Sequence, residues 1–162
     1  MVRWRYVQWL AKQITADTAT ATVTTFGSTP YDVIRFTTGQ RATVNWHVDE
    51  AHNFAFLKPE FSLVFATVGG VATGIADWHV IDRTSIPNGN AWAAPNHDNK
   101  LLHPVTAGGT QIWITPWIAD ASVVTWQPSE WVPINIERQV INDTISDSLD
   151  LFSVSMRYRV RG

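Results

Sequence analysis

The 162-residue sequence contains no cysteine, which excludes a disulfide framework and any metal site built from thiolates. It also contains no apolar stretch close to the roughly 20 residues that a membrane-spanning helix needs. The N-terminal apolar run is interrupted by charged and polar side chains, so no signal-peptide core is expected there. We therefore expect one domain over residues 1–162, a length at which folding buries roughly 70% of the surface of the unfolded chain.

Charge is scarce as well. Charged residues make up 16% of the chain, against about 25% in ordinary globular domains. The formal net charge of -2 argues against a specific nucleic-acid partner, because nonspecific affinity depends on many Lys and Arg side chains that neutralise phosphates. Tryptophan is abundant instead, with nine copies. A charge-poor, aromatic-rich surface is typical of proteins that bury much of their outside against neighbours, and a monomer with a large aromatic core is the alternative.

Short runs of alternating apolar and polar residues dominate the chain. In residues 41–48 the apolar face would carry Ala42, Val44, Trp46 and Val48. In residues 149–160 the inward positions would be Phe152, Val154, Met156, Tyr158 and Val160. Further strands are expected at 2–9, 13–26, 32–37, 61–68, 75–82, 111–115, 121–126 and 132–141. Eight to ten short strands, separated by Gly, Pro, Asn and Asp clusters, predict an all-β sandwich or barrel of antiparallel strands.

One long loop is expected at residues 84–109. This stretch carries three prolines, an Asn-Gly turn at Asn88 and Gly89, and a closing Gly108-Gly109 pair. Loops of this length in compact domains are usually functional, disordered or held by a partner. Trp92, in the middle of the loop, favours a loop that is held.

The patterns that would indicate an enzyme are not present in the sequence. His97, Asp98 and His103 lie in the predicted loop, where convergence on an ion is one interpretation and ordinary loop residues the other. We favour the second, so no metal or cofactor is expected. There is no G-x-S-x-G elbow for a nucleophilic serine and no phosphate-binding glycine fingerprint. Asp49 and Glu50 are adjacent, so they point to opposite faces of a strand and do not form a catalytic carboxylate pair.

Four tryptophans gather in the segment WITPWIADASVVTWQPSEWVP, residues 113–133: Trp113, Trp117, Trp126 and Trp131. Their rings have three possible uses. They fill the core of the sandwich, they anchor a subunit contact, or they form a flat platform that stacks on sugar rings. The sequence leaves these three open.

Arginines occupy alternate positions at both chain ends. Arg3 and Arg5 stand near the start, and Arg157, Arg159 and Arg161 near the close. In an extended strand each set lines one face, with Trp4 and Tyr6 on the opposite face of the first strand. Edge protection against aggregation explains one or two of these charges. Five of them indicate an acidic neighbouring subunit or an anionic lipid surface.

A charge-poor chain with this strand pattern, one long loop and the basic ends MVRWRYVQW and SMRYRVRG resembles the single jelly-roll capsid proteins of icosahedral viruses. It is most similar to the small major capsid protein of tailless, membrane-containing phages. The resemblance implies a single-domain jelly-roll β-sandwich that acts as a structural coat protein and has no catalytic residues. It also implies assembly in the host cytoplasm into a virion shell, through homo-oligomer contacts and contacts with a second coat protein.

Two functions are therefore carried forward. The first is the coat protein, and the alternative is a carbohydrate-binding, receptor-binding or decoration module of the same fold, for which the ligand would be a sugar. Under the first, the expected interface residues are Arg3, Arg5, Arg157, Arg159, Arg161, Trp92, Trp117, Trp126 and Trp131.

Overall fold

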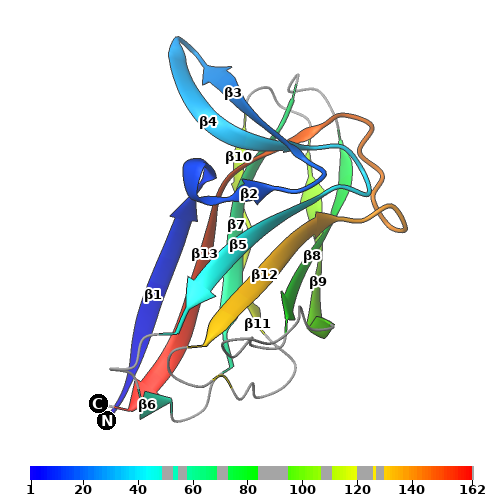
Figure 1. Ribbon diagram of the computed structural model, residues 1–162. Coiled ribbons are helices and arrows are strands. Elements are labelled where there is room, and N and C mark those ends of the chain that lie inside the picture. The colour runs from blue at the N-terminus through cyan, green and yellow to red at the C-terminus, as the bar shows by residue number, and fades with distance from the viewer. Residues whose placement is uncertain are drawn as a thin grey trace.

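The computed structural model describes residues 1–48, 53–54, 58–68, 73–83, 95–106, 111–119, 126 and 130–161. These residues form thirteen strands and one short 3-10 helix, η1 (Ala11–Gln13), as Figure 1 shows. The strands are β1 (Val2–Leu10), β2 (Thr15–Ala16), β3 (Thr20–Phe26), β4 (Thr29–Phe36), β5 (Arg41–His47), β6 (Asn53–Phe54), β7 (Glu60–Thr67), β8 (Gly74–Arg83), β9 (Pro95–Val105), β10 (Ile112–Ile114), β11 (Ile118–Ala119), β12 (Trp131–Arg138) and β13 (Leu149–Arg161). Within this described part, no helix is long and apolar enough to cross a bilayer.

Two antiparallel sheets face each other. The larger sheet has the order β10-β7-β13-β4-β3, with β1 and β6 also paired to β13 and β11 paired to β7. The smaller sheet has the order β2-β5-β12-β8-β9. From β4 onward the chain alternates between them: β4, β7, β10 and β13 belong to the larger sheet, and β5, β8, β9 and β12 to the smaller. This is the strand order of a jelly roll, so the predicted all-β jelly-roll sandwich is confirmed.

The core lies between the sheets and is rich in aromatic rings. Trp78 of β8 lies edge-on to Phe36 of β4 and to Phe65 of β7, with centroid distances of 5.2 and 5.4 Å. Trp46 of β5 makes similar contacts with Trp126 and with Tyr158 of β13. Because large rings from both sheets interlock, burial of apolar area holds the sheets together. The alternation predicted for residues 41–48 is confirmed, since all four apolar positions there are buried.

The strand count differs from the predicted eight to ten. Most of the excess comes from pieces of two or three residues, such as β2, β6 and β11, which are too short to show a periodic pattern. The predicted strand 13–26 is also divided. Its first part belongs to η1 and β2, and after a turn at Asp17 and Thr18 the chain crosses to the larger sheet as β3.

The predicted long loop 84–109 is wrong over Pro95–Val105, which form β9 and pair with β8 along their whole length. The prolines obscured this strand. Pro95 and Pro104 are tolerated because β9 is the edge strand of the smaller sheet. The remaining parts of the loop, 84–94 with Trp92 and 107–109, lie outside the described residues, as do residues 121–125 of another predicted strand.

A β-bulge interrupts β13. The register with β7 shifts between Leu151 and Ser153, so Phe152 is the extra residue. Before and after the bulge Leu151 and Val154 are fully buried, whereas Phe152 is only partly buried and contacts rings outside the core. The inward position predicted for Phe152 is therefore wrong, because one inserted residue reverses the alternation at this point.

Candidate binding face

The outer surface of the larger sheet has an opening at the point where the strand paired with β13 changes from β4 to β1. Leu149–Leu151 of β13 pair with β4, whereas Ser153–Arg161 pair with β1. Between these stretches β1 ends at Leu10 and the chain turns into η1. The bulged Phe152 lies at this seam. Bulges of this kind re-aim a side chain toward the surface and are common beside binding sites.

A hairpin supplies one wall of the opening. Strands β3 and β4 pair from Thr20–Arg35 to Phe26–Thr29, and the two residues between them begin with Gly27, whose φ is 61°. A positive φ at this position gives the primed turn that matches strand twist, and glycine adopts it without steric cost. In Figure 1 the hairpin extends past the end of the sandwich. Two rings of the hairpin, Phe26 and Tyr31, contact Phe152.

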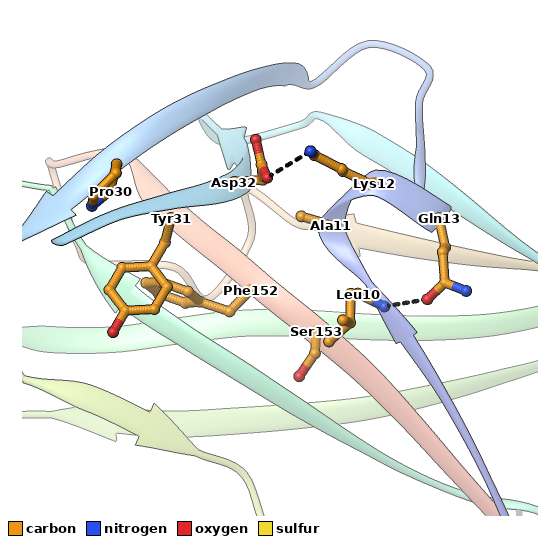
Figure 2. A pocket seen from close by; sticks show the side chains of 9 residues that line it. All are labelled: Leu10, Ala11, Lys12, Gln13, Pro30, Tyr31, Asp32, Phe152 and Ser153. Atoms are coloured by element: carbon orange, nitrogen blue, oxygen red, sulfur yellow. Dashed lines mark hydrogen bonds and ion pairs between the residues drawn. The ribbon is translucent and has the colours of Figure 1, made fainter.

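The resulting cavity, called here the seam pocket, has a volume of about 580 Å³. This lies within the range of about 300–1,000 Å³ typical of small-ligand sites. Figure 2 shows the side chains that line it, contributed by β1, η1, β4 and β13. They are Leu10, Ala11, Lys12, Gln13, Pro30, Tyr31, Asp32, Phe152 and Ser153.

Aromatic rings form the apolar side of the seam pocket. Phe152 lies 5.9 Å from Tyr31 in an edge-on arrangement and 5.4 Å from Phe26. Phe26 and Tyr31 are themselves 6.1 Å apart. Each ring is thus held by two others, which fixes its plane, yet Tyr31 remains 43% exposed and Leu10 57% exposed. The pocket therefore offers oriented apolar surface to a ligand.

Polar groups stand on the η1 side of the same pocket. The Lys12 ammonium lies 3.4 Å from the Asp32 carboxylate, and both side chains are well exposed. The Gln13 side-chain oxygen accepts a hydrogen bond of 2.9 Å from the backbone N–H of Leu10, as drawn in Figure 2. Its amide N–H₂ group is left for another acceptor. A ligand in the pocket would meet a charge pair and an amide beside the rings.

A second group, called here the aromatic–arginine cluster, lies farther along β13. The Arg157 guanidinium sits 4.6 Å from the Trp4 ring and 4.4 Å from the Trp117 ring, between the two. Arg157 also forms an ion pair with the Glu60 carboxylate of β7. The Arg159 guanidinium also lies over the Trp4 ring, 4.6 Å from its centroid. Cation–π attraction therefore holds both arginines against indole rings.

Strand register shows that the cluster and the seam pocket share one face. Arg157 lies opposite Tyr6, and Arg159 opposite Trp4, so these side chains point to the same side of the sheet. Tyr6 in turn contacts Trp117 at 6.3 Å and is 64% exposed. Between the cluster and the pocket stand Gln8 and Ser155, which are also opposite each other. The outer face is thus polar in its middle and aromatic at both ends.

The predicted arginine rows do not form one basic surface. Arg3 lies opposite Val160 and Arg5 opposite Tyr158, on the side of β1 away from the aromatic–arginine cluster. Both are exposed and, within the described part of the chain, neither forms an ion pair. The side chain of Arg161 lies outside the described residues, although its backbone pairs with Val2. The ends of the chain lie together, as Figure 1 shows. The strand register places Arg3 and Arg5 on the opposite side of the sheet from Arg157 and Arg159.

The predicted tryptophans are also separated. Trp117 is half-buried in the aromatic–arginine cluster. Trp126 is only 3% exposed and packs in the core, so its assignment to a surface contact or platform is corrected. Trp131 is 49% exposed but belongs to β12 of the smaller sheet, beside a hollow of about 240 Å³ on the opposite side of the sandwich. The spacing in sequence did not indicate that Trp126 is buried in the core while Trp117 and Trp131 lie on opposite sides of the sandwich.

The predicted loop residues His97, Asp98 and His103 do not converge on one point. His97 lies 3.0 Å from the buried Asp82 carboxylate, and Asp98 instead approaches His79 at 2.9 Å. His103 packs between core rings, where burial lowers its pKa below the ordinary value. Among the residues that the structure describes, no group of three or more metal-ligating side chains is found.

The sequence prediction did not include the residues of the seam pocket. Tyr31 lies outside the predicted strand 32–37. Phe152 was predicted to face the core because the alternating pattern of residues 149–160 does not reveal the β-bulge. Lys12 had no place among the predicted site residues. A signal was present in the segment TTFGSTPY, residues 24–31, where a glycine between two β-branched runs indicates a hairpin.

Comparison with known proteins yields structural similarity alone. No family model matches the chain, and no curated protein matches it. A Podospora anserina GH26-CBM35 β-(1,4)-mannanase has a similar structure, with a TM-score of 0.50, 12% identity and coverage of 93% of this chain. A Paenibacillus cycloisomaltooligosaccharide glucanotransferase is similar with a TM-score of 0.49, 12% identity and coverage of 91%. This chain spans 27% and 18% of their lengths, and the mannanase shares its β-sandwich fold.

Proposed function

We propose that this chain is a carbohydrate-binding β-sandwich module, which binds a saccharide on the outer face of the larger sheet. The seam pocket is its primary site. The module would hold its ligand without chemical change and would need no metal or cofactor.

The observation that carries this proposal is the composition of the seam pocket. A pyranose ring has an apolar face of C–H groups and a rim of hydroxyl groups. Its binding site therefore needs a fixed aromatic surface beside hydrogen-bonding side chains. Tyr31 and Phe152 supply the rings, and Lys12, Gln13 and Asp32 supply donors and acceptors at the rim. These groups come from three separate elements, η1, β4 and β13, that meet only in the folded chain.

The fold is compatible with this use. The similar structure with a TM-score of 0.50 is that of a GH26-CBM35 β-(1,4)-mannanase. At 12% identity this similarity supports the β-sandwich architecture alone, so the assignment for this chain rests on the seam pocket.

Alanine substitution of the pocket rings tests the proposal. A glycan array identifies a ligand, and calorimetry then compares wild type with Tyr31→Ala and Phe152→Ala. Loss of one ring removes roughly 1.5 kcal/mol of apolar contact, so binding should weaken about tenfold for each. Trp131→Ala is the matched control, because it removes an exposed ring from the opposite sheet. Equal effects of Trp131→Ala and Tyr31→Ala, or no binding by wild type, would refute the proposal.

A second candidate, a coat subunit that self-assembles and meets a second coat protein, is favoured by one observation. The edge strand β10 pairs only with β7 in the described part of the sheet. Its Ile112 is 48% exposed and Ile114 is 69% exposed. An open edge with apolar side chains is a template for pairing with another chain. Analytical ultracentrifugation tests this candidate. The wild type should form oligomers, and the Ile114→Lys substitution should dissociate them. A wild-type protein that stays monomeric at all concentrations would contradict the candidate.

A further inference from the structure

The two arginines of the aromatic–arginine cluster are in different electrostatic situations. Arg157 is neutralised by its ion pair with Glu60 and is partly buried between Trp4 and Trp117. Arg159 stacks on Trp4 and is exposed, and within the described residues no carboxylate lies at ion-pair distance from it. One of the two positive charges therefore faces outward without a counter-ion from the described chain.

Stacking also fixes how Arg159 presents its donors. The five N–H groups of a guanidinium point outward in its plane, so a ring against its flat face leaves those at the edges accessible. The contact with Trp4 holds the side chain in place, which lowers the entropy lost when an anion binds. A carboxylate is planar and accepts two parallel hydrogen bonds from this fork. Arg159 is thus prepared for a carboxylate.

The distance to the seam pocket indicates the size of the ligand. Phe152 and Arg159 are seven residues apart on β13, which corresponds to about 23 Å at about 3.3 Å per residue. Gln8 and Ser155 lie between them on the same face and offer hydrogen bonds along the way. A ligand that contacts both ends is therefore an elongated chain rather than a single sugar.

We propose that the saccharide is acidic, and that Arg159, held by Trp4, binds the carboxylate of a uronic acid residue while the seam pocket holds another part of the same polymer. This inference rests on the proposed carbohydrate-binding function. It adds the chemical class of the ligand and a second subsite.

Charge favours a saccharide over other anionic partners. Within the cluster, the charges of Arg157 and Glu60 cancel, which leaves the single positive charge of Arg159. Anionic lipid surfaces and nucleic acids are bound by many such charges acting together. Arg3 and Arg5 do not add to this charge, because they point to the other side of β1. One oriented guanidinium beside aromatic rings suits a ligand with isolated charges.

The test compares polygalacturonate with a neutral β-glucan and a neutral β-mannan, using wild type, Arg159→Gln and Arg159→Lys. We expect wild type to bind the uronate polymer at least tenfold more tightly than either neutral polymer. Arg159→Gln should remove that preference, so that the uronate polymer and the neutral polymers bind this variant about equally. Arg159→Lys should recover less than half of the preference, because an ammonium lacks the planar fork. Arg5→Gln, on the opposite side of β1, is the matched control and should keep the preference.

The outcomes separate this inference from the function on which it rests. If the neutral polymers bind wild type as tightly as polygalacturonate does, and only Tyr31→Ala and Phe152→Ala weaken that binding, the acidic subsite is refuted. The seam pocket as a saccharide site is then still supported. If no saccharide binds wild type, the proposed function itself fails. Tighter binding to dextran sulfate than to polygalacturonate would overturn the carboxylate assignment. Arg159-dependent binding to phosphatidylserine vesicles, with none to polygalacturonate, would make a lipid surface the partner and overturn the inference.

Discussion

Arg138 is a buried charged side chain whose guanidinium donates five hydrogen bonds, and its replacement should be severely destabilising. It is 1% exposed at the end of β12. Its guanidinium donates two hydrogen bonds to the Asp143 carboxylate, at 2.9 and 2.8 Å. Three more reach the backbone carbonyls of Phe36, Ile145 and Asp147, at 3.1, 2.6 and 2.7 Å. One side chain thus ties β4 and the segment before β13 to the end of β12.

The magnitude follows from what Arg138→Met leaves behind. The Asp143 side chain is fully buried, so it would keep a charge without its counter-ion, and three carbonyls would lose a donor. Breaking a buried ion pair from one side costs about 3–5 kcal/mol. For a domain of this size, each kcal/mol lowers Tm by about 2–4 °C, so the expected decrease is about 6–20 °C. The Tm of Arg138→Lys should lie between those of the wild type and Arg138→Met, because lysine keeps the positive charge but lacks the planar guanidinium that donates several hydrogen bonds.

Urea unfolding followed by tryptophan fluorescence measures this directly, since several indoles lie in the core. Arg5→Met is the matched control, because Arg5 is exposed and outside any ion pair of the described residues; it should change stability by less than about 0.5 kcal/mol. A loss below about 1 kcal/mol for Arg138→Met, comparable to that control, would refute the role given to this network.

Two further substitutions test the local structure. Gly74 has φ of 153°, and an added Cβ would lie 2.6 Å from the Thr144 hydroxyl oxygen, so Gly74→Ala should cost about 1–3 kcal/mol in urea unfolding; an unchanged midpoint would contradict this. His103 has its pKa lowered by burial, so between its folded pKa and the ordinary value of about 6.5 the unfolded chain binds more protons. Stability should therefore fall as pH decreases below about 6.5, and His103→Gln should reduce that slope; equal slopes in the two proteins would argue against it.

The sequence predicted those parts of the fold that depend on a regular alternation. The segment 41–47 forms β5 and buries its alternate residues Ala42, Val44 and Trp46. The segment 61–67 lies in β7 and buries Phe61, Leu63 and Phe65 on one face. Alternation specifies which face is buried, and a two-layer β-sandwich follows when many such strands must be covered on one side. The jelly-roll order of the strands was implied only by the resemblance to the capsid proteins. The strand β9 was not predicted because prolines such as Pro95 and Pro104 are tolerated only in an edge strand. The edge position of β9 is a property of the assembled sheet and not of its own sequence.

The candidate site was hidden from sequence for a related reason. The seam pocket exists because β13 changes partners and bulges at Phe152, and both events depend on strand pairing over long separations. The pairing of Trp4 with Arg159 likewise joins the two ends of the chain. The sequence did show that rings and guanidinium groups alternate in both end strands. It did not show that the rings of β1 would cover the arginines of β13.

The most direct test of the binding face is a ¹H–¹⁵N chemical-shift titration of the wild-type protein with oligogalacturonate. The account predicts shifts in the amides of Leu10–Gln13, Tyr31–Asp32 and Phe152–Ser153, continuing along β13 to Arg159. Shifts confined to the smaller sheet around Trp131, or none at saturating ligand, would contradict it.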